Sequence, residues 1–168
     1  MARIALPEGS GEETDRLWQL APEIGEAGDA WGRVVREHVT LSVREREAAR
    51  MRIATINGCR ICQETRIAGA DEWGIDDGFY AAVDDPARRD VFSERERLAI
   101  EFAERFDAGA RTFDDAFWAS LRAAFSDAEL VELAASVAKW LALGRINAVF
   151  ELSVSCPLVL ELGRPAPV

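Results

Sequence analysis

The sequence predicts an all-α protein built as a single domain over residues 1–168. Apolar residues recur at spacings of three and four, which is the pattern of amphipathic helices. Alternating apolar and polar runs rich in Val, Ile and Thr, the usual sign of strands, are nearly absent. At three places a serine precedes a glutamate by three residues. This capping-box arrangement marks the first turn of a helix, because each side chain binds a free backbone N–H.

The apolar stripes and the capping boxes place the helices along the chain. The boxes pair Ser42 with Glu45, Ser93 with Glu96 and Ser126 with Glu129. The stripes cover residues 31–38, 98–106, 118–125 and 130–141. With the glycine and proline positions between them, these signals predict about six or seven helices. Residues 1–14 and 157–168 carry no such stripe, so both ends are expected to be loosely attached.

The helix from Ser126 to about Phe150 has the widest apolar face in the chain. So broad a face is typical of a helix at the centre of a bundle or in a subunit interface. We therefore expect the helices to pack in a homo-oligomer, with the number of subunits left open.

Composition and charge exclude several classes of protein. The chain has 168 residues, a hydrophobic share of 49% and a charged share of 30%, which is globular composition. Its formal net charge is −10, so it is not expected to bind the phosphate backbone of a nucleic acid. Charged residues interrupt the most apolar segment, residues 130–154, which argues against a membrane span. An export signal is not recognisable, and the expectation is a cytoplasmic protein.

The segment with the clearest chemistry is a Cys-X-X-Cys pair, Cys59 and Cys62. It follows Asn57-Gly58, which is expected to end one helix so that Cys59 opens the next. At a helix N-terminus, free N–H groups and the helix dipole stabilise a thiolate and make it a nucleophile. The spacing also brings the two sulfurs within bonding reach, so that a disulfide can form and reopen.

This segment resembles the alkylhydroperoxidase D / carboxymuconolactone decarboxylase family. The matching residues are Glu47, the Ile56-Asn57-Gly58-Cys59-X-X-Cys62 turn and the helix start Phe92-Ser93-Glu94-Arg95-Glu96, and the family-like core covers residues 41–150. The resemblance implies an all-α oligomeric fold and an antioxidant activity, the thiol-dependent reduction of organic hydroperoxides. It implies that Cys62 is the peroxidatic thiol, Cys59 its resolving partner and Glu47 part of a proton relay. An external dithiol would reduce the pair, and no organic or metal cofactor would be needed.

One position departs from the family pattern. Peroxidase members carry a histidine four residues after the second cysteine, and here that residue is Arg66. Arginine keeps its charge and cannot shuttle protons, although it can stabilise a thiolate. If the helices on either side of Asn57-Gly58 form an antiparallel hairpin, Glu47 and Arg66 lie abreast. We therefore expect a partly buried ion pair between them, which would make Glu47 a poorer proton acceptor and peroxidase turnover slow.

Other interpretations of these residues stay open. Cys59 and Cys62 could be buried apolar residues, or they could bind zinc together with Cys156 and His38. His38, the single histidine, could equally lie in an interface, and Cys156 could be a structural or free thiol. Glu47 could be a solvated charge, or a buried one that needs a partner. The protein could also be a non-catalytic or redox-sensing member of the fold. A carboxymuconolactone decarboxylase-like activity fits less well, because such members lack the cysteine pair and depend on a histidine.

Overall fold

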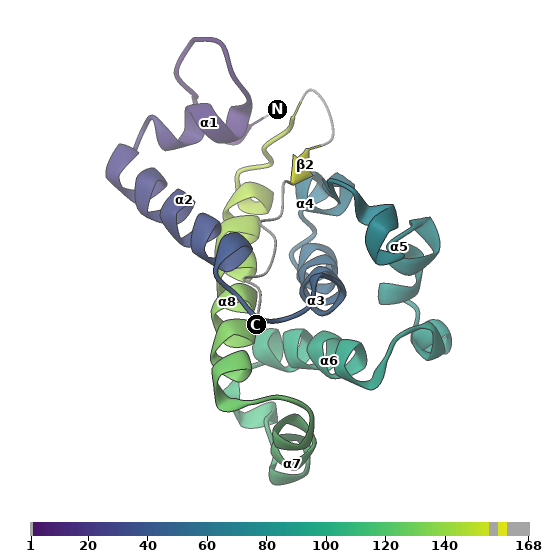
Figure 1. Ribbon diagram of the computed structural model, residues 1–168. Coiled ribbons are helices and arrows are strands. Elements are labelled where there is room, and N and C mark those ends of the chain that lie inside the picture. Colours follow the sequence, from purple (N-terminus) through teal and green to yellow (C-terminus); the bar gives the residue numbers. More distant parts are fainter. Residues whose placement is uncertain (1, 155–157, 161–168) are drawn as a thin grey trace.

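The computed structural model describes residues 2–154 and 158–160, and helices dominate it (Figure 1). The α-helices are α1 (Glu13–Trp18), α2 (Pro22–Glu37), α3 (Val43–Ile56), α4 (Arg60–Glu64), α5 (Asp77–Val83), α6 (Glu94–Ala108), α7 (Asp115–Ala124) and α8 (Asp127–Val149). The remaining described elements are the 3₁₀ helices η1 (Ala70–Trp73), η2 (Pro86–Val91) and η3 (Ala110–Thr112), and the strands β1 (Arg66–Ile67) and β2 (Val159–Leu160). The all-α prediction is confirmed. Short helices such as α1 and α4, which carry no apolar stripe of their own, account for the helices beyond the expected number.

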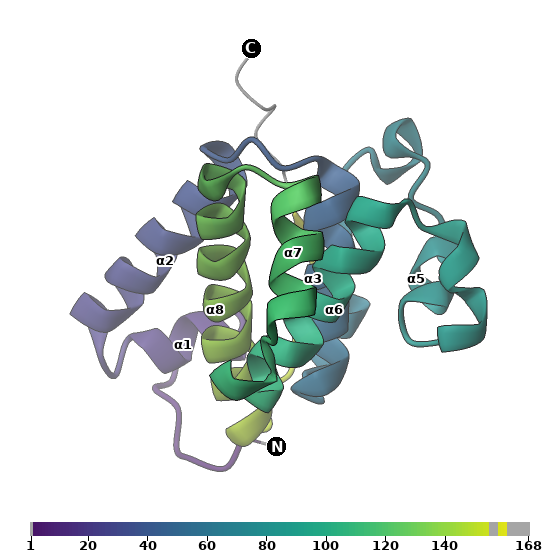
Figure 2. The ribbon, with the colours of Figure 1, turned by 90° about the horizontal axis from the view of Figure 1, so that it is seen from below.

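Helices α3, α6 and α8 form the centre of the molecule, with α3 packed against both of the others. Helix α8, the longest, carries α2 on its outer side (Figure 2). Helix α7 packs against α6, and α5 packs against α3. Because α3 is enclosed by neighbours, even its charged residues Glu45, Arg46, Glu47 and Arg50 are buried. The most enclosed helix is therefore α3, whereas the wide apolar face of α8 is only partly covered.

Three apolar clusters fill the spaces between the helices. The largest joins α3, α6, α7 and α8 and includes Ile53, Phe102 and Leu133. The second joins α3, α5 and α6, and the third surrounds Cys59 at the start of α4. Each fully buried large apolar side chain contributes about 1.5–3 kcal/mol to folding. None of the helices in the described ranges combines the length and the apolar character that crossing a bilayer requires.

Part of the N-terminal segment packs against the cluster around Cys59. Ala2, Ile4 and Leu6 contact it, and the backbone N–H of Arg3 donates to the carbonyl of Phe150 at 2.9 Å. Residues 2–6 are thus attached more firmly than the sequence suggests, because their alternating apolar side chains meet the end of α8. Of the C-terminal end expected to be loose, residues 157 and 161–168 lie outside the described part of the chain.

Helix α2 meets α8 through glycines and not through its expected apolar face. Gly32 and Val35 are buried, but Trp31 is 38% exposed, Val34 is 50% exposed and His38 is exposed. An atom added as Cβ at Gly32 would lie 3.3 Å from a side-chain carbon of α8. This close approach rotates the glycine side of α2 toward α8, so the predicted stripe over residues 31–38 points partly to solvent.

The three predicted capping boxes are all present. Ser42, Ser93 and Ser126 are the N-caps of α3, α6 and α8. Each serine oxygen accepts the N–H of the glutamate three residues later, and that glutamate accepts the N–H of the serine. A cap of this kind contributes about 1 kcal/mol, and together the boxes fix where the three central helices begin.

Arginines join these three helix starts to one another. Arg95 on α6 donates to Glu45 of α3 and to Glu129 of α8, each at 2.5 Å. Arg44 on α3 donates to Glu96 of α6 at 2.6 Å. We call these five residues, together with the three serines, the helix-start cluster. Each of its carboxylates caps its own helix and also ties that helix to a neighbour.

A short parallel strand pairing joins the end of α4 to a distant part of the chain. Arg66 in β1 lies opposite Val159 in β2. The backbone N–H of Arg66 donates to the carbonyl of Leu158 at 3.0 Å, and that of Ala68 donates to Leu160 at 2.9 Å. Arg66 is therefore extended and not helical. The helical hairpin expected around Asn57-Gly58 ends with the one short helix α4.

Candidate redox site

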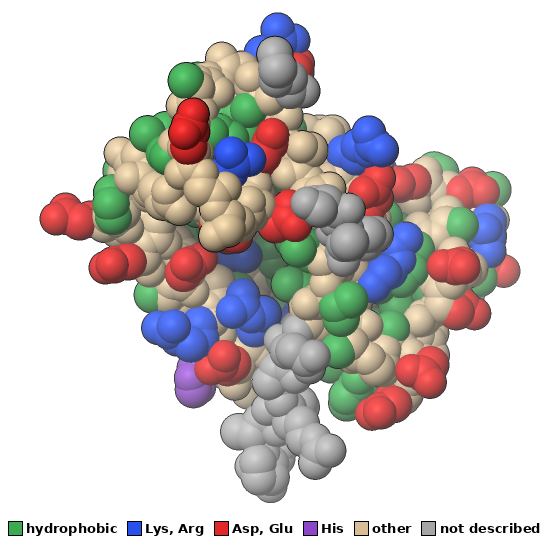
Figure 3. Space-filling view, turned by 90° about the horizontal axis from the view of Figure 1, so that it is seen from above, with side chains coloured by type: hydrophobic (Ala, Val, Ile, Leu, Met, Phe, Trp, Pro, Cys, Tyr) green, Lys and Arg blue, Asp and Glu red, His purple; other side chains and the backbone are tan. Residues whose placement is uncertain are grey.

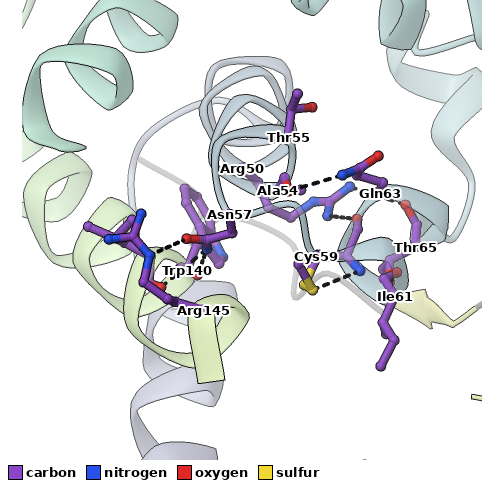
Figure 4. Close-up of a disulfide and its surroundings, with 12 residues drawn as sticks. Arg50, Ala54, Thr55, Asn57, Cys59, Ile61, Gln63, Thr65, Trp140 and Arg145 are labelled. Atoms are coloured by element: carbon purple, nitrogen blue, oxygen red, sulfur yellow. Dashed lines mark hydrogen bonds between the residues drawn. A yellow bond between two sulfur atoms is a disulfide. The ribbon is translucent and has the colours of Figure 1, made fainter. Parts of the chain in front are cut away.

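The turn between α3 and α4 is held against α8 (Figure 4). Gly58 adopts a φ of 61°, a left-handed conformation that glycine enters without strain. The side-chain nitrogen of Asn57 donates to the carbonyls of Trp140 and Leu141, both at 3.2 Å. Its side-chain oxygen accepts from Nε of Arg145 at 3.0 Å. The predicted helix break is confirmed, and contacts with α8 fix its position.

Cys59 and Cys62 are joined by a disulfide directly after this turn. Their Cα atoms are 5.2 Å apart, an ordinary separation for such a bond. Cys59 is the N-cap of α4, and its sulfur accepts the backbone N–H of Cys62 at 3.3 Å. Cys59 is 1% exposed, whereas Cys62 is partly exposed. A small molecule arriving from solvent therefore reaches Cys62 more readily.

Glu47 is buried on α3 and is paired with Arg50, one turn further along the same helix. Two nitrogens of Arg50 each lie 2.6 Å from an oxygen of Glu47. Arg50 also donates to the carbonyls of Cys62 at 2.7 Å and Thr65 at 3.1 Å. Burial lowers the pKa of Arg50, but the Glu47 carboxylate more than compensates, and the net pKa lies above its usual value. We call Glu47 and Arg50 the buried pair; it anchors the backbone of α4 to α3.

The expected ion pair between Glu47 and Arg66 is not formed by these two described residues. Arg66 donates instead to the carbonyl of Gln63 at 2.6 Å, and its guanidinium carbon lies 4.2 Å from the ring centre of Tyr80. The prediction is wrong for two reasons. Helix α4 ends before residue 66, so Arg66 does not lie on a helix facing α3. Arg50 also lies within one turn of Glu47 and occupies both of its oxygens.

Tyr80 on α5 lies beside the buried pair. Its hydroxyl is buried and makes no hydrogen bond of ordinary geometry within the described part of the chain. Burial, followed by the negative charge of Glu47, raises the pKa of this hydroxyl well above its usual value. Tyr80 therefore stays protonated at neutral pH and covers the buried pair as a neutral group.

Two cavities reach the disulfide, one lined by each of its cysteines. The first, which we call the Cys59 cavity, has a volume of about 370 Å³. Cys59 lines it together with polar side chains that include Glu64, Asn147 and Glu151. The second, which we call the Cys62 cavity, has a volume of about 160 Å³. The two sulfurs of the bond thus face different surroundings.

The Cys62 cavity combines an apolar wall with three cations. Its cationic lining residues are Arg36, Arg50 and Lys139, and its apolar ones include Trp140. Burial, followed by the charges of Arg36 and Arg50, lowers the pKa of Lys139 to about 8. In the view from above, Lys and Arg side chains gather beside a central hollow of the molecular surface (Figure 3). The lining is therefore suited to a small ligand with both an apolar part and a negative charge.

Three residues of this site escape prediction from the sequence. Arg50 lies three residues after Glu47, a helical spacing for ion pairs that could have identified it. Lys139 interrupts the widest apolar stripe, which is a weaker signal. Gly144 has no local signal: a Cβ added there would lie 2.8 Å from Nδ2 of Asn57 and 3.4 Å from the sulfur of Cys62. Only glycine lets α8 approach the disulfide so closely.

The four zinc ligands considered from the sequence do not come together in the described part of the chain. Cys59 and Cys62 are bonded to each other, and His38 is exposed at the end of α2. Cys156 lies outside the described residues, as does the expectation about its role. Residues 2–154 and 158–160 hold no cluster of three or more His, Cys, Asp or Glu side chains arranged for a metal ion.

Comparison with known proteins identifies the fold. No family model matches the chain. The uncharacterised protein YnjA of Escherichia coli (strain K12) is 33% identical over 102 residues, which are 60% of this chain and 56% of that protein. Among solved structures, an uncharacterised peroxidase-related protein from Silicibacter sp. TM1040 superimposes with a TM-score of 0.70 at 17% identity, over 92% of both chains.

A second solved structure gives the same result. It is a protein of unknown function from Agrobacterium tumefaciens, provisionally named as the antioxidant defence protein AhpD, with a TM-score of 0.67 at 21% identity. The match covers 80% of this chain and 92% of that one. Likeness at such low identity establishes the fold and leaves the reaction to the site itself. The chain has the all-α fold of the AhpD-like proteins.

Proposed function

We propose that this protein is a thiol-dependent oxidoreductase that reduces organic hydroperoxides through Cys59 and Cys62. The observation that carries the proposal is the disulfide, in which Cys59 is buried while Cys62 is partly exposed and lines a cavity that also holds cations. A cycling pair benefits from this difference, because one sulfur must meet the substrate while the other needs only to meet its partner. The peroxidase-related name of a structural neighbour supports the same reaction class.

The oxidative half of the cycle starts from the reduced protein. The thiolate of Cys62 attacks the outer oxygen of the hydroperoxide, so that an S–O bond forms as the O–O bond breaks. The alkoxide takes a proton from solvent and leaves as an alcohol, and Cys62 becomes a sulfenic acid. Cys59, as a thiolate, then attacks this sulfur and water leaves. The two thiols have supplied two electrons and are joined as the disulfide.

An external dithiol completes the cycle. Its thiolate attacks the Cys59–Cys62 bond and forms a mixed disulfide with the protein. Its second thiol then displaces the protein sulfur, so that two electrons and two protons pass to the cysteines. The dithiol leaves as a disulfide. Every electron in this scheme comes from a thiol, and the proposal calls for no organic or metal cofactor.

Cations of the cavity stabilise the Cys62 thiolate. Helix α4 has only five residues, so its dipole contributes little to this charge. Arg36 and Lys139 line the cavity with Cys62. Arg50 is paired with the carboxylate of Glu47, whereas Arg36 and Lys139 form no ion pair with the described residues. An adjacent cation favours the ionised form of a thiol. Reactivity in this scheme therefore depends on the cavity more than on the helix start.

The roles proposed for Glu47 and Arg66 follow from their contacts. Glu47 positions Arg50, which holds the carbonyl of Cys62, so Glu47 acts through another residue and not as a proton relay. Arg66 lies over Tyr80 and supports the loop after α4. With solvent as the proton source, the expected phenotype is a reactive thiol with slow turnover.

Hydroperoxide consumption tests the proposal. Purified protein is mixed with cumene hydroperoxide and dithiothreitol, and the alcohol formed is measured against the dithiol oxidised. We expect catalytic turnover that Cys62→Ser abolishes. In Cys59→Ser, a sulfenic acid should accumulate at Cys62 and be trapped by dimedone. Cys156→Ser serves as the matched control, since it removes a cysteine that has no role in the scheme.

Two results would replace this proposal. A disulfide that forms once with peroxide and is reopened by dithiol, without sustained alcohol production, would support the redox-sensing alternative. This alternative is retained because the chain has Arg66 where peroxidase members have the relay histidine, and slow turnover is therefore expected. If Cys59 and Cys62 both remain alkylatable after peroxide treatment, the thiol chemistry itself is excluded.

We also propose that the chain forms a homo-oligomer through the exposed apolar part of α8. Val131 and Val149 on this helix are 69% and 64% exposed. Leu141, Ile146 and Phe106 line an open apolar depression of about 620 Å³ nearby. Exposed apolar surface of this kind marks interfaces. A stable monomer in sedimentation at micromolar concentration would contradict this proposal.

A further inference from the structure

We infer that the Cys62 cavity selects hydroperoxides that carry a carboxylate, and that Lys139 and Arg36 bind this group. The inference rests on the proposed peroxidase function and names the class of substrate for it. Its basis is the pair Lys139 and Arg36, which line the cavity and whose side chains form no ion pair within the described part of the protein.

Lys139 and Arg36 are brought together at one glycine. A Cβ atom added at Gly32 would lie 3.2 Å from a guanidinium nitrogen of Arg36 and 3.3 Å from Cε of Lys139. Both side chains line the Cys62 cavity, and neither forms an ion pair or a hydrogen bond with the described residues. Two like charges held close in a partly desolvated space repel each other. An anion placed between them relieves that repulsion.

The charged groups around Lys139 do not offset its repulsion from Arg36. Burial and the charges of Arg36 and Arg50 lower the pKa of Lys139 to about 8, and the carboxylate of Asp29 opposes the shift with a smaller effect. Lys139 is still mostly protonated at neutral pH. The buried carboxylate of Glu47 has both oxygens occupied by Arg50.

A further cation lies next to the same cavity. Arg46 is 4% exposed, and its Nε and one terminal nitrogen have no hydrogen-bond partner in the part of the chain that the structure describes. It lines a cavity of about 20 Å³ that shares Arg36, Arg50 and Trp140 with the Cys62 cavity. A space of this size holds about one water molecule. Arg46 therefore adds a third side chain with unused donors next to the Cys62 cavity.

The remainder of the cavity is mostly apolar and small. Trp140, Leu143, Leu158 and Leu160 form its wall. A ligand with a carboxylate at the cations and a short hydrocarbon body against this wall would bring its peroxide toward Cys62. Guanidinium groups suit a carboxylate because their planar N–H pairs match its two oxygens. A volume of about 160 Å³ favours short compounds over long-chain ones.

Alkylation of Cys62 tests the anion site without any peroxidase activity. In reduced Cys59→Ser protein, the rates of modification by iodoacetate and iodoacetamide are followed by peptide mass spectrometry, with glutathione as the reference thiol. We expect an iodoacetate-to-iodoacetamide ratio above that of glutathione. Lys139→Gln and Arg36→Gln should each lower this ratio about fivefold, since a nearby cation concentrates the anionic reagent.

Arg60→Gln is the matched control. Arg60 is also near the disulfide, but its side chain is 88% exposed and it lines the Cys59 cavity instead. The same charge is removed, and the ratio should stay at the wild-type value. Circular dichroism confirms that each variant is folded, and two independent cation variants keep the test decisive if one of them is not.

A matched pair of substrates then addresses the reaction itself. The probes are 4-hydroperoxy-4-methylpentanoate and its methyl ester, which differ in charge and by one methyl group. We expect a higher kcat/KM for the acid, and a difference that Lys139→Gln removes. Equal values for the two probes with sustained turnover would overturn the inference and leave the peroxidase function standing. A Lys139-dependent alkylation ratio without turnover would support the anion site and reject the peroxidase.

Discussion

Helix α3 carries two sets of glutamate–arginine contacts that differ in their surroundings. In the helix-start cluster, Glu45 accepts from Arg95, whose side chain is 34% exposed. In the buried pair, the side chains of Glu47 and Arg50 are 2% and 7% exposed. The first set joins the starts of three helices, whereas the second joins α3 to the backbone that carries Cys62. Because solvent reaches Arg95 but neither partner of the buried pair, breaking the first set should cost less unfolding free energy than breaking the second.

The largest effect is expected from Arg50→Met. This change leaves the Glu47 carboxylate buried without its cation and removes the donors to the carbonyls of Cys62 and Thr65. Removing one partner of a buried pair costs about 3–5 kcal/mol of unfolding free energy. Urea denaturation measures the loss, and the same variant should alkylate at Cys62 with altered kinetics.

The double variant Glu47→Gln with Arg50→Met separates charge from contact. It removes the unpaired carboxylate as well, so it should recover part of the lost stability. If the double variant is no more stable than Arg50→Met, the unpaired buried charge is not the source of the lost stability. Burial would then not explain the difference between the buried pair and the helix-start cluster.

Lys139, a cation that forms no ion pair with the described residues, should show the opposite effect: replacing it should stabilise the protein. The folded-state pKa of Lys139 is lowered to about 8, below its unfolded value of about 10.4. The unfolded chain therefore binds more protons between these values, and wild-type stability from this group rises as pH increases from about 8 to 10.4. Lys139→Met should raise the unfolding free energy by about 3 kcal/mol at pH 7.

The pH dependence of that gain provides its control. Since the wild-type penalty disappears as Lys139 loses its proton, the advantage of Lys139→Met should shrink above pH 8. A gain that is constant from pH 7 to pH 10 would show that the methionine acts by packing. Thermal unfolding at several pH values distinguishes the two.

A smaller effect is expected from Arg95→Met in the helix-start cluster. Its hydrogen bond lowers the pKa of Glu129, aided by the N–H of Ser126. A carboxylate with a lowered pKa adds stability above its unfolded pKa of about 4.3 and loses it as pH falls through the folded value. Arg95→Met should cost about 1–2 kcal/mol at pH 7, since the site is partly exposed. Much less of this loss should remain at pH 3, as acid titration of both proteins would show.

The smallest effect is expected at the caps themselves. Ser126→Ala removes the acceptor for the N–H of Glu129, at a cost of about 1 kcal/mol. Ser93→Ala should cost a similar amount, because the Ser93 oxygen accepts the N–H of Glu96 at 3.2 Å in the same capping-box arrangement. A loss at either serine as large as that of Arg50→Met would remove the distinction between the helix-start cluster and the buried pair.

The parts of this molecule that sequence predicts are those decided within a few residues. The three capping boxes and the break at Asn57-Gly58 are confirmed because each depends on residues within one turn of helix. The predicted partner of Glu47, Arg66, is wrong because that prediction depends on where α4 ends. Arg66 lies beyond that end, where it pairs with Val159 in a contact between distant parts of the chain. Lys139 and Gly144 belong to the site for the same long-range reason.

The pairing of β1 with β2 has a consequence for ligand size. Leu158 and Leu160, which accept the two backbone hydrogen bonds of this pairing, also form part of the wall of the Cys62 cavity. A wall held by so few bonds opens at a lower free energy than the enclosed helix α3, by local fluctuation and not by global unfolding. Amide hydrogen exchange at Arg66 and Ala68 therefore reports how often the cavity enlarges. The upper limit on the size of a molecule that fits this cavity is then an equilibrium quantity, and not a fixed volume.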